Sequence, residues 1–96
     1  MTELNSIRQI LTQLKPELTQ RFFFVFIGLF GSIVRDDFFP TSDIDIIVDF
    51  SKPVGVEFID LADFIEKKLK KKVDLVSKKG LKPKYLQQIQ SEIIYV

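Results

Sequence analysis

The chain has 96 residues, of which 46% are hydrophobic and ten are Phe, and it carries a formal net charge of +1 at pH 7. This length and apolar content predict one globular domain, spanning residues 1–96, with a hydrophobic core. The sequence contains no Cys and no His, which excludes disulfides, His/Cys zinc sites, thiol nucleophiles and Ser-His-Asp catalysis. The near-neutral charge gives no reason to expect direct nucleic-acid binding.

The N-terminus lacks the basic and then apolar pattern of a signal peptide. The longest apolar run, residues 22–30, is too short to span a bilayer. We therefore expect a cytoplasmic protein with no membrane contact.

The first third of the chain predicts a helix and then a strand. Apolar residues recur at helical spacing from Leu4 to Leu14, which indicates an amphipathic helix that Pro16 ends, with one or two further turns open before Phe22. Residues 22–27 are aromatic and β-branched and apolar on both faces, as in a central strand that ends between Gly28 and Gly31. Ser32 is an expected N-cap for a short helix reaching Asp37.

A second strand is expected at residues 43–50, and its two faces differ. One face carries four apolar residues, Ile44, Ile46, Val48 and Phe50, and the other begins with Asp43 and Asp45. Because side chains alternate along a strand, both carboxylates point to the same face.

The remaining sequence alternates again between helix and strand. Apolar residues from Phe58 to Leu69 form the stripe of a helix, and residues 72–77 predict a third strand that Asp74 interrupts. A last helix is expected to start near Pro83, and the final residues 94–96 read as an extended segment. We expect Asp74 to lie beside the other two carboxylates because the strands are expected to be neighbours.

Three clustered carboxylates need a positive partner. Two unit charges about 4 Å apart repel by roughly 4 kcal/mol at an effective dielectric of about 20. Oxygen ligands favour Mg²⁺, which completes its shell with water and substrate phosphates, so we expect a two-metal phosphoryl-transfer site. Asp43 and Asp45 would hold both ions, and Asp74 would hold the ion that activates the attacking hydroxyl.

The turn between the first two strands is expected to bind the substrate's phosphates. Gly31 lets a phosphate approach the backbone closely, Ser32 offers a hydroxyl, and Arg35 lies one turn further on. Taken alone, an Asp-x-Asp at a strand start or a Gly-Ser before a helix is ordinary turn chemistry. Their joint occurrence with Asp74 favours a nucleoside triphosphate site.

These residues also carry a family resemblance. The sequence resembles the signature of the polymerase β-like nucleotidyltransferase superfamily, specifically its minimal nucleotidyltransferase branch. The resemblance lies in the segment 29–32 (LFGS), the ten residues between Ser32 and Asp43, and the segment 42–48 (SDIDIIV). The resemblance continues to the end of the chain. It implies an α/β (α+β) fold with a small mixed β-sheet flanked by helices, metal ligands at Asp43, Asp45 and Asp74, and phosphate binding by Gly31 and Ser32.

The chain departs from the branch's pattern after the phosphate turn. Val34 stands where a small residue is usual, Asp36 replaces a Gly, and Phe38 and Phe39 occupy a loop that is usually polar. The expected acidic triad is intact, so we still expect an active enzyme.

The resemblance further implies a biological role. Members of the minimal branch typically act as antitoxins that neutralise a HEPN-type toxin by transferring AMP from ATP to a toxin tyrosine. A 96-residue chain that lacks a second domain for the acceptor fits an acceptor on a partner protein. Two alternatives remain open: transfer to a small molecule such as an aminoglycoside, and a non-catalytic antitoxin that acts by occlusion.

Overall fold

The first helix is longer than the sequence predicts. The computed structural model describes residues 3–35, 42–52 and 54–96, and helix α1 spans Glu3–Arg21 with Pro16 inside it. The expectation that Pro16 ends the helix is therefore wrong. Leu11 and Leu18 lie on either side of the proline and are fully buried, so core packing holds both halves of the helix although one backbone hydrogen bond is missing.

In the described ranges, four strands form one mixed sheet in the order β3-β2-β1-β4. Their bounds are β1 Phe24–Phe30, β2 Ile44–Phe50, β3 Val73–Ser77 and β4 Ile94–Tyr95. Strand β1 runs antiparallel to both β2 and β4, whereas β2 and β3 are parallel. The expected mixed sheet is confirmed, and β1 is a central strand, although it starts at Phe24 rather than at Phe22.

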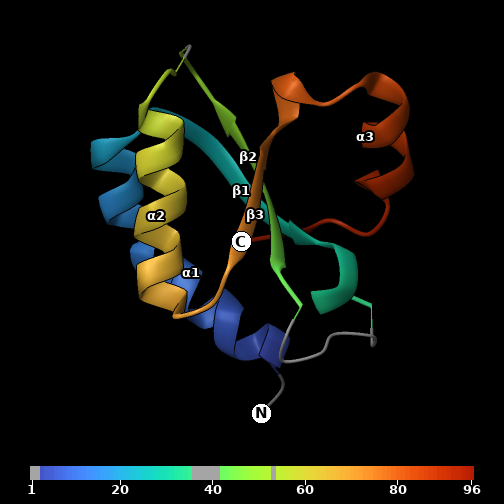
Figure 1. The fold of residues 1–96 in the computed structure, drawn as a ribbon, viewed down its shortest axis with the longest axis horizontal. Coiled ribbons are helices and arrows are strands. Elements are labelled where there is room, and N and C mark those ends of the chain that lie inside the picture. The colour runs from blue at the N-terminus through green and yellow to red at the C-terminus, as the bar shows by residue number, and fades with distance from the viewer. Residues whose placement is uncertain (1–2, 36–41, 53) are drawn as a thin grey trace.

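The helices lie on opposite faces of this sheet (Figure 1). Helix α2, Glu57–Leu69, connects the parallel strands β2 and β3 and lies beside α1, while α3, Pro83–Gln90, stands on the other side. Two short 3₁₀ helices, η1 Gly31–Ile33 and η2 Lys78–Gly80, follow β1 and β3. No helix in the described parts of the chain is long and apolar enough to cross a membrane.

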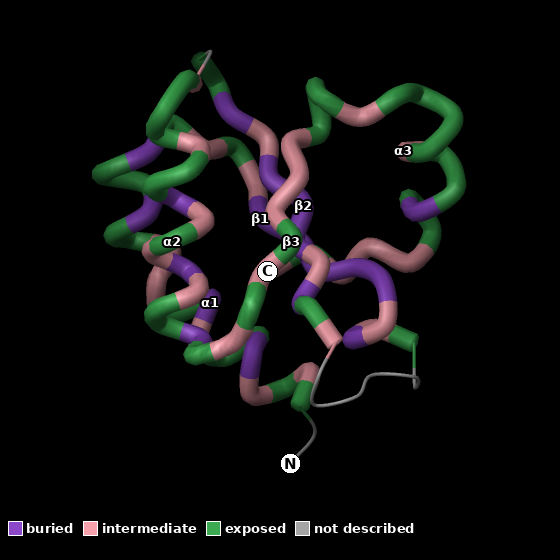
Figure 2. The backbone as a smooth tube through the Cα atoms, viewed as in Figure 1, coloured by how far each residue is buried: buried purple, intermediate pink, exposed green. Residues whose placement is uncertain are grey.

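The core divides unequally between the two faces. The larger apolar cluster fills the space between the sheet and helices α1 and α2, and it includes the predicted core face of β2, with Ile44, Ile46, Val48 and Phe50. The smaller cluster joins Phe30, Ile47 and Ile89 under α3. Most buried residues accordingly lie on the α1/α2 side (Figure 2). The α3 face, which also carries Asp45, is only partly covered.

Candidate active site

Two of the predicted carboxylates are neighbours in the sheet. Asp45 of β2 is the register partner of Asp74 of β3, and the parallel pairing places both on the face that α3 partly covers. Asp43 lies two residues before Asp45, just outside the strand, and is exposed. The structure thus brings Asp74 next to the Asp43-x-Asp45 segment, as the strand pattern predicts.

The charge around Asp45 is unbalanced. Burial, together with the negative charges of Asp74, Asp43 and Glu92, raises the pKa of the Asp45 carboxyl to about 6. Among the described residues, Arg35 lowers the pKa of Asp45. A half-buried carboxyl surrounded by other acids is destabilised when it ionises, so this end of the sheet favours a bound cation.

Gly31 is required where β1 meets η1. It has a φ of +79°, and a Cβ atom added there would overlap the Asp45 carboxylate and lie 3.0 Å from its Cγ. The Gly31 carbonyl accepts hydrogen bonds from the backbone N–H groups of Val34 and Arg35, at 3.0 and 3.1 Å. Glycine therefore allows the turn to close directly against the carboxylate of the neighbouring strand.

The expected helix with Ser32 as its N-cap is wrong in the described part of this segment. Ser32 lies inside the three-residue η1, whose N-cap position is Phe30 and lacks a side-chain cap. So short a helix offers little dipole for binding a phosphate. A three-residue 3₁₀ turn has no periodicity that sequence reasoning could detect. Residues 36–41, which include Asp36, Phe38 and Phe39, lie outside the described residues.

Glu92 is a site residue that sequence reasoning missed. It follows α3, and its Oε1 accepts a hydrogen bond from the Gly31 backbone N–H at 3.0 Å. The Arg35 Nη1 atom lies 3.3 Å from each carboxylate oxygen of Glu92 and forms an ion pair with it. Nothing in the local sequence signals this role, because Gly31 and Glu92 are 61 residues apart in the chain.

The three carboxylates provide the oxygen atoms that a hard divalent cation prefers as ligands. Asp43, Asp45 and Asp74 offer oxygen ligands, and in the described part of the chain the charges of Asp74, Asp43 and Glu92 act on Asp45 against that of Arg35. Among the residues that the structure describes, no three acidic side chains already converge on one metal position. The carboxylates fit Mg²⁺ by the chemistry of their oxygen atoms, and the register places two of them on neighbouring strands.

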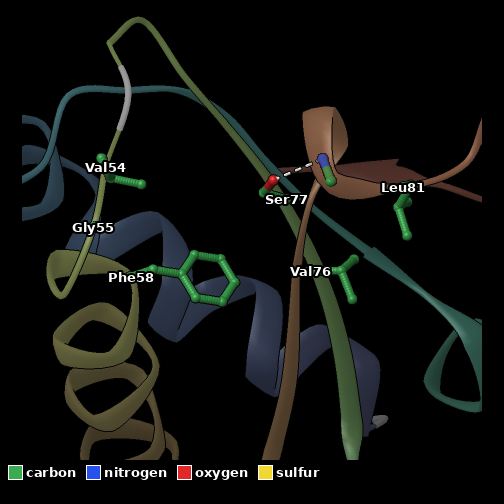
Figure 3. Close-up of a pocket in the computed structure, with 7 residues that line it drawn as sticks. Val54, Gly55, Phe58, Val76, Ser77 and Leu81 are labelled. Carbon is green, nitrogen blue, oxygen red and sulfur yellow. Dashed lines mark hydrogen bonds between the residues drawn. The ribbon is translucent and has the colours of Figure 1, made fainter.

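A cavity of about 500 Å³ lies away from these acids, past the end of β3 (Figure 3). It is lined by Val54, Gly55, Phe58, Val76, Ser77, Gly80 and Leu81. Ser77 Oγ accepts a hydrogen bond from the Gly80 N–H at 3.0 Å and closes one side of the cavity. None of the three carboxylates lines this cavity, and its nearest lining residue on β3, Val76, lies two residues beyond Asp74, about 7 Å along the strand.

The site thus consists of a glycine turn that lies against Asp45, which is paired with Asp74 in a mixed sheet. The chain belongs to the nucleotidyltransferase domain family, whose profile matches residues 6–96. The fold expected from the resemblance is confirmed by a solved structure of a candidate minimal nucleotidyltransferase, with 27% identity and a TM-score of 0.82 over 98% of this chain and 95% of that chain.

The chain is also similar to a protein adenylyltransferase in sequence and to a toxin-antitoxin structure in fold. The chain is 42% identical to the protein adenylyltransferase MntA of Thermococcus cleftensis, over 100% of this chain and 98% of the relative. Its fold also matches that of one chain in a solved structure of a tri-AMPylated Shewanella oneidensis HEPN toxin in complex with an MNT antitoxin, with 22% identity and a TM-score of 0.70 over 93% of this chain and 70% of the matched chain.

Proposed function

We propose that this chain is a Mg²⁺-dependent protein adenylyltransferase that moves AMP from ATP to a tyrosine hydroxyl of a HEPN-type toxin and thereby acts as its antitoxin. The observation that carries the proposal is the register pairing of Asp45 with Asp74, next to the Gly31 turn. At this end of the strands, the paired carboxylates lie beside a backbone turn that would bind phosphate. The 42% identity to a protein adenylyltransferase supports the choice of AMP and of a protein acceptor.

Each predicted site residue has a role in this proposal. Asp43 and Asp45 would hold two Mg²⁺ ions, with Asp74 sharing the ion on the acceptor side. Bound Mg²⁺ would neutralise charge on the triphosphate and make the acceptor hydroxyl easier to deprotonate.

The phosphate turn would hold the other part of the substrate. The backbone N–H of Gly31, the hydroxyl of Ser32 and the guanidinium of Arg35 would bind the β- and γ-phosphates. The acceptor oxygen then bonds to the α-phosphorus while the bond to the β-phosphate breaks. Pyrophosphate leaves, and the hydroxyl proton passes to a carboxylate of the site.

We further propose that residues 1–96 work as one minimal nucleotidyltransferase domain and that the toxin itself presents the acceptor. The family match over residues 6–96 and the single sheet support one catalytic unit. The solved structure of a HEPN toxin with an MNT antitoxin, in which the matched chain has the same fold, supports a HEPN-type toxin as the partner. We place the reaction in the cytoplasm, where ATP is supplied.

Intact mass spectrometry tests this function directly. The purified chain is incubated with the product of a neighbouring HEPN-type gene, ATP and Mg²⁺, and both proteins are weighed. The partner should gain one or more AMP groups, and the Asp43→Asn variant should deliver none. A partner that is bound and neutralised without any change in mass would overturn the catalytic proposal in favour of occlusion. A gain of mass by an added aminoglycoside instead would make the acceptor a small molecule.

A further inference from the structure

The groups assigned to phosphate binding already hold an anion from the chain itself. Glu92 Oε1 accepts the Gly31 N–H at 3.0 Å, and both Glu92 oxygens lie 3.3 Å from Arg35 Nη1. The Glu92 side chain is 23% exposed and the Arg35 side chain is 55% exposed, so an anion can reach the pair from solvent. A carboxylate oxygen and a phosphate oxygen accept hydrogen bonds from the same donors, namely a backbone N–H and a guanidinium.

One backbone N–H cannot serve both anions at full strength. The negative charge of Glu92 also reaches Asp45, since it contributes to the raised pKa of that carboxyl. A triphosphate entering here would meet Glu92 at short range, and the two anions would repel each other. The substrate's phosphate and the Glu92 carboxylate therefore exclude one another at the Gly31 turn.

We propose that Glu92 is an internal anion that occupies the phosphate site of the nucleotide-free chain and that the incoming triphosphate must displace it. The inference rests on the proposed function for the identity of the substrate. It adds a residue that sets how tightly that substrate binds. Because a tethered carboxylate is always present at high effective concentration, it lowers the apparent affinity of every anion that uses this turn.

The turn that carries Glu92 lies outside the larger core cluster. Glu92 lies in the turn between α3 and β4, and within α3 only Ile89 is buried. Figure 1 shows α3 on the side of the sheet opposite the large helical layer. An element with few buried contacts opens locally at low free-energy cost. Displacement of the Glu92 carboxylate would therefore loosen the turn that follows α3.

Inorganic tripolyphosphate with Mg²⁺ is a suitable probe because it has no base or ribose. Its dissociation constant is measured by calorimetry for the wild-type chain, for Glu92→Gln and for the control Glu57→Gln. Glu57 makes a matched contact, since its Oε2 accepts the Gly55 N–H at 2.9 Å, away from the acids. Removing the competing charge should tighten binding by Glu92→Gln about tenfold, and Glu57→Gln should bind like wild type.

The direction of the change separates this role from a structural one. If Glu92 only shaped the turn, Glu92→Gln would bind tripolyphosphate more weakly and melt earlier. Equal or weaker binding by Glu92→Gln, or no binding by either protein, would overturn the inference. Tighter binding without AMP transfer to any partner would sustain the inference and overturn the proposed function.

A second measurement on the wild-type chain avoids any dependence on how the variant folds. Hydrogen exchange is followed by mass spectrometry in the peptide that covers residues 86–93. Saturating Mg²⁺ and tripolyphosphate should make amides after α3 exchange faster, because Glu92 has lost its partners. Unchanged or slower exchange in that peptide would overturn the displacement.

Discussion

Asp45 and Asp74 lie directly opposite each other on the parallel strands β2 and β3. This pairing places two negative charges side by side, with Asp43 two residues before the first of them. Without a cation the arrangement costs stability, because burial and neighbouring acids both raise the pKa of Asp45. Acids held together at a cost to the fold are the pattern expected of a functional site, and the proposal that Asp45 and Asp74 hold a cation builds on it.

Asp45→Asn should therefore stabilise the metal-free protein at neutral pH. The pKa of Asp45 rises from 3.8 to about 6 on folding, so the folded state holds this proton more tightly than the unfolded state. Its contribution to stability is fully present below about pH 4 and is lost as the pH rises through about 6. At pH 8 the variant should be more stable by about 1 kcal/mol, a value discounted for solvent screening at a half-buried site.

Urea unfolding of both proteins at pH 8 and pH 4, without divalent ions, measures this difference. The advantage of Asp45→Asn should shrink toward zero at pH 4. Asp63→Asn removes a carboxylate from the exposed face of α2 and serves as the control, with an expected change within about 0.5 kcal/mol. A variant that is less stable than wild type at pH 8 would mean that the Asp45 carboxylate is structural.

Sequence periodicity predicted the parts of the site that depend on strands. Alternation in β2 placed Asp45 on the face opposite Ile44, and a lone acid in an apolar strand marked Asp74. Both inferences depend only on the two-residue repeat of a strand, which the apolar neighbours reveal. The mixed sheet itself came from the family resemblance.

The sequence did not predict the full length of α1 or the role of Glu92, because both depend on contacts between distant residues. Pro16 does not end α1 because Leu11 and Leu18 are buried on both sides of it, which local propensity cannot show. Glu92 reaches Gly31 only because the turn after α3 folds back beside β1, and these residues are 61 positions apart. Such contacts follow from tertiary packing, so no local pattern could reveal them.

Gly31→Ala should destabilise the protein and disturb the site together. An alanine would have to adopt a φ of +79°, and its Cβ would overlap the Asp45 carboxylate. The left-handed backbone alone costs about 1–2 kcal/mol for a non-glycine residue, so the melting temperature should fall by several degrees. Gly55→Ala is the control, because the nearest atom to its added Cβ is 3.7 Å away and its φ is not positive. Differential scanning calorimetry that gives equal melting temperatures for the two variants would contradict this account of the turn.

Mg²⁺ and ATP together should raise the melting temperature of the wild-type chain. A ligand that binds only the folded state stabilises it by about 2.7 kcal/mol at 100 times its dissociation constant. The double variant Asp43→Asn, Asp45→Asn should lose this rise in a thermal-shift assay. Asp49→Asn is a matched control in the same strand, because Asp49 lies about 13 Å from Asp45 along β2 and its Oδ1 accepts the Phe50 N–H. The same loss in Asp49→Asn would show that charge in β2, rather than a local site, governs binding.

Asp74 and Ser32 should fail in different ways, because the proposal places them at opposite ends of the reacting group. Asp74 lies on β3 and is assigned to the acceptor side, whereas Ser32 lies in η1 beside Gly31 and is assigned to the leaving phosphates. Asp74→Asn should keep most of the affinity for ATP and lose transfer of AMP to the partner. Ser32→Ala should lose one hydrogen bond to the triphosphate, worth about 1 kcal/mol, and so bind ATP about fivefold more weakly. Calorimetry with ATP and Mg²⁺, run beside the intact-mass assay on the same preparations, separates the two effects. Equal losses of ATP affinity in both variants would reject this division and assign Asp74 to substrate binding as well.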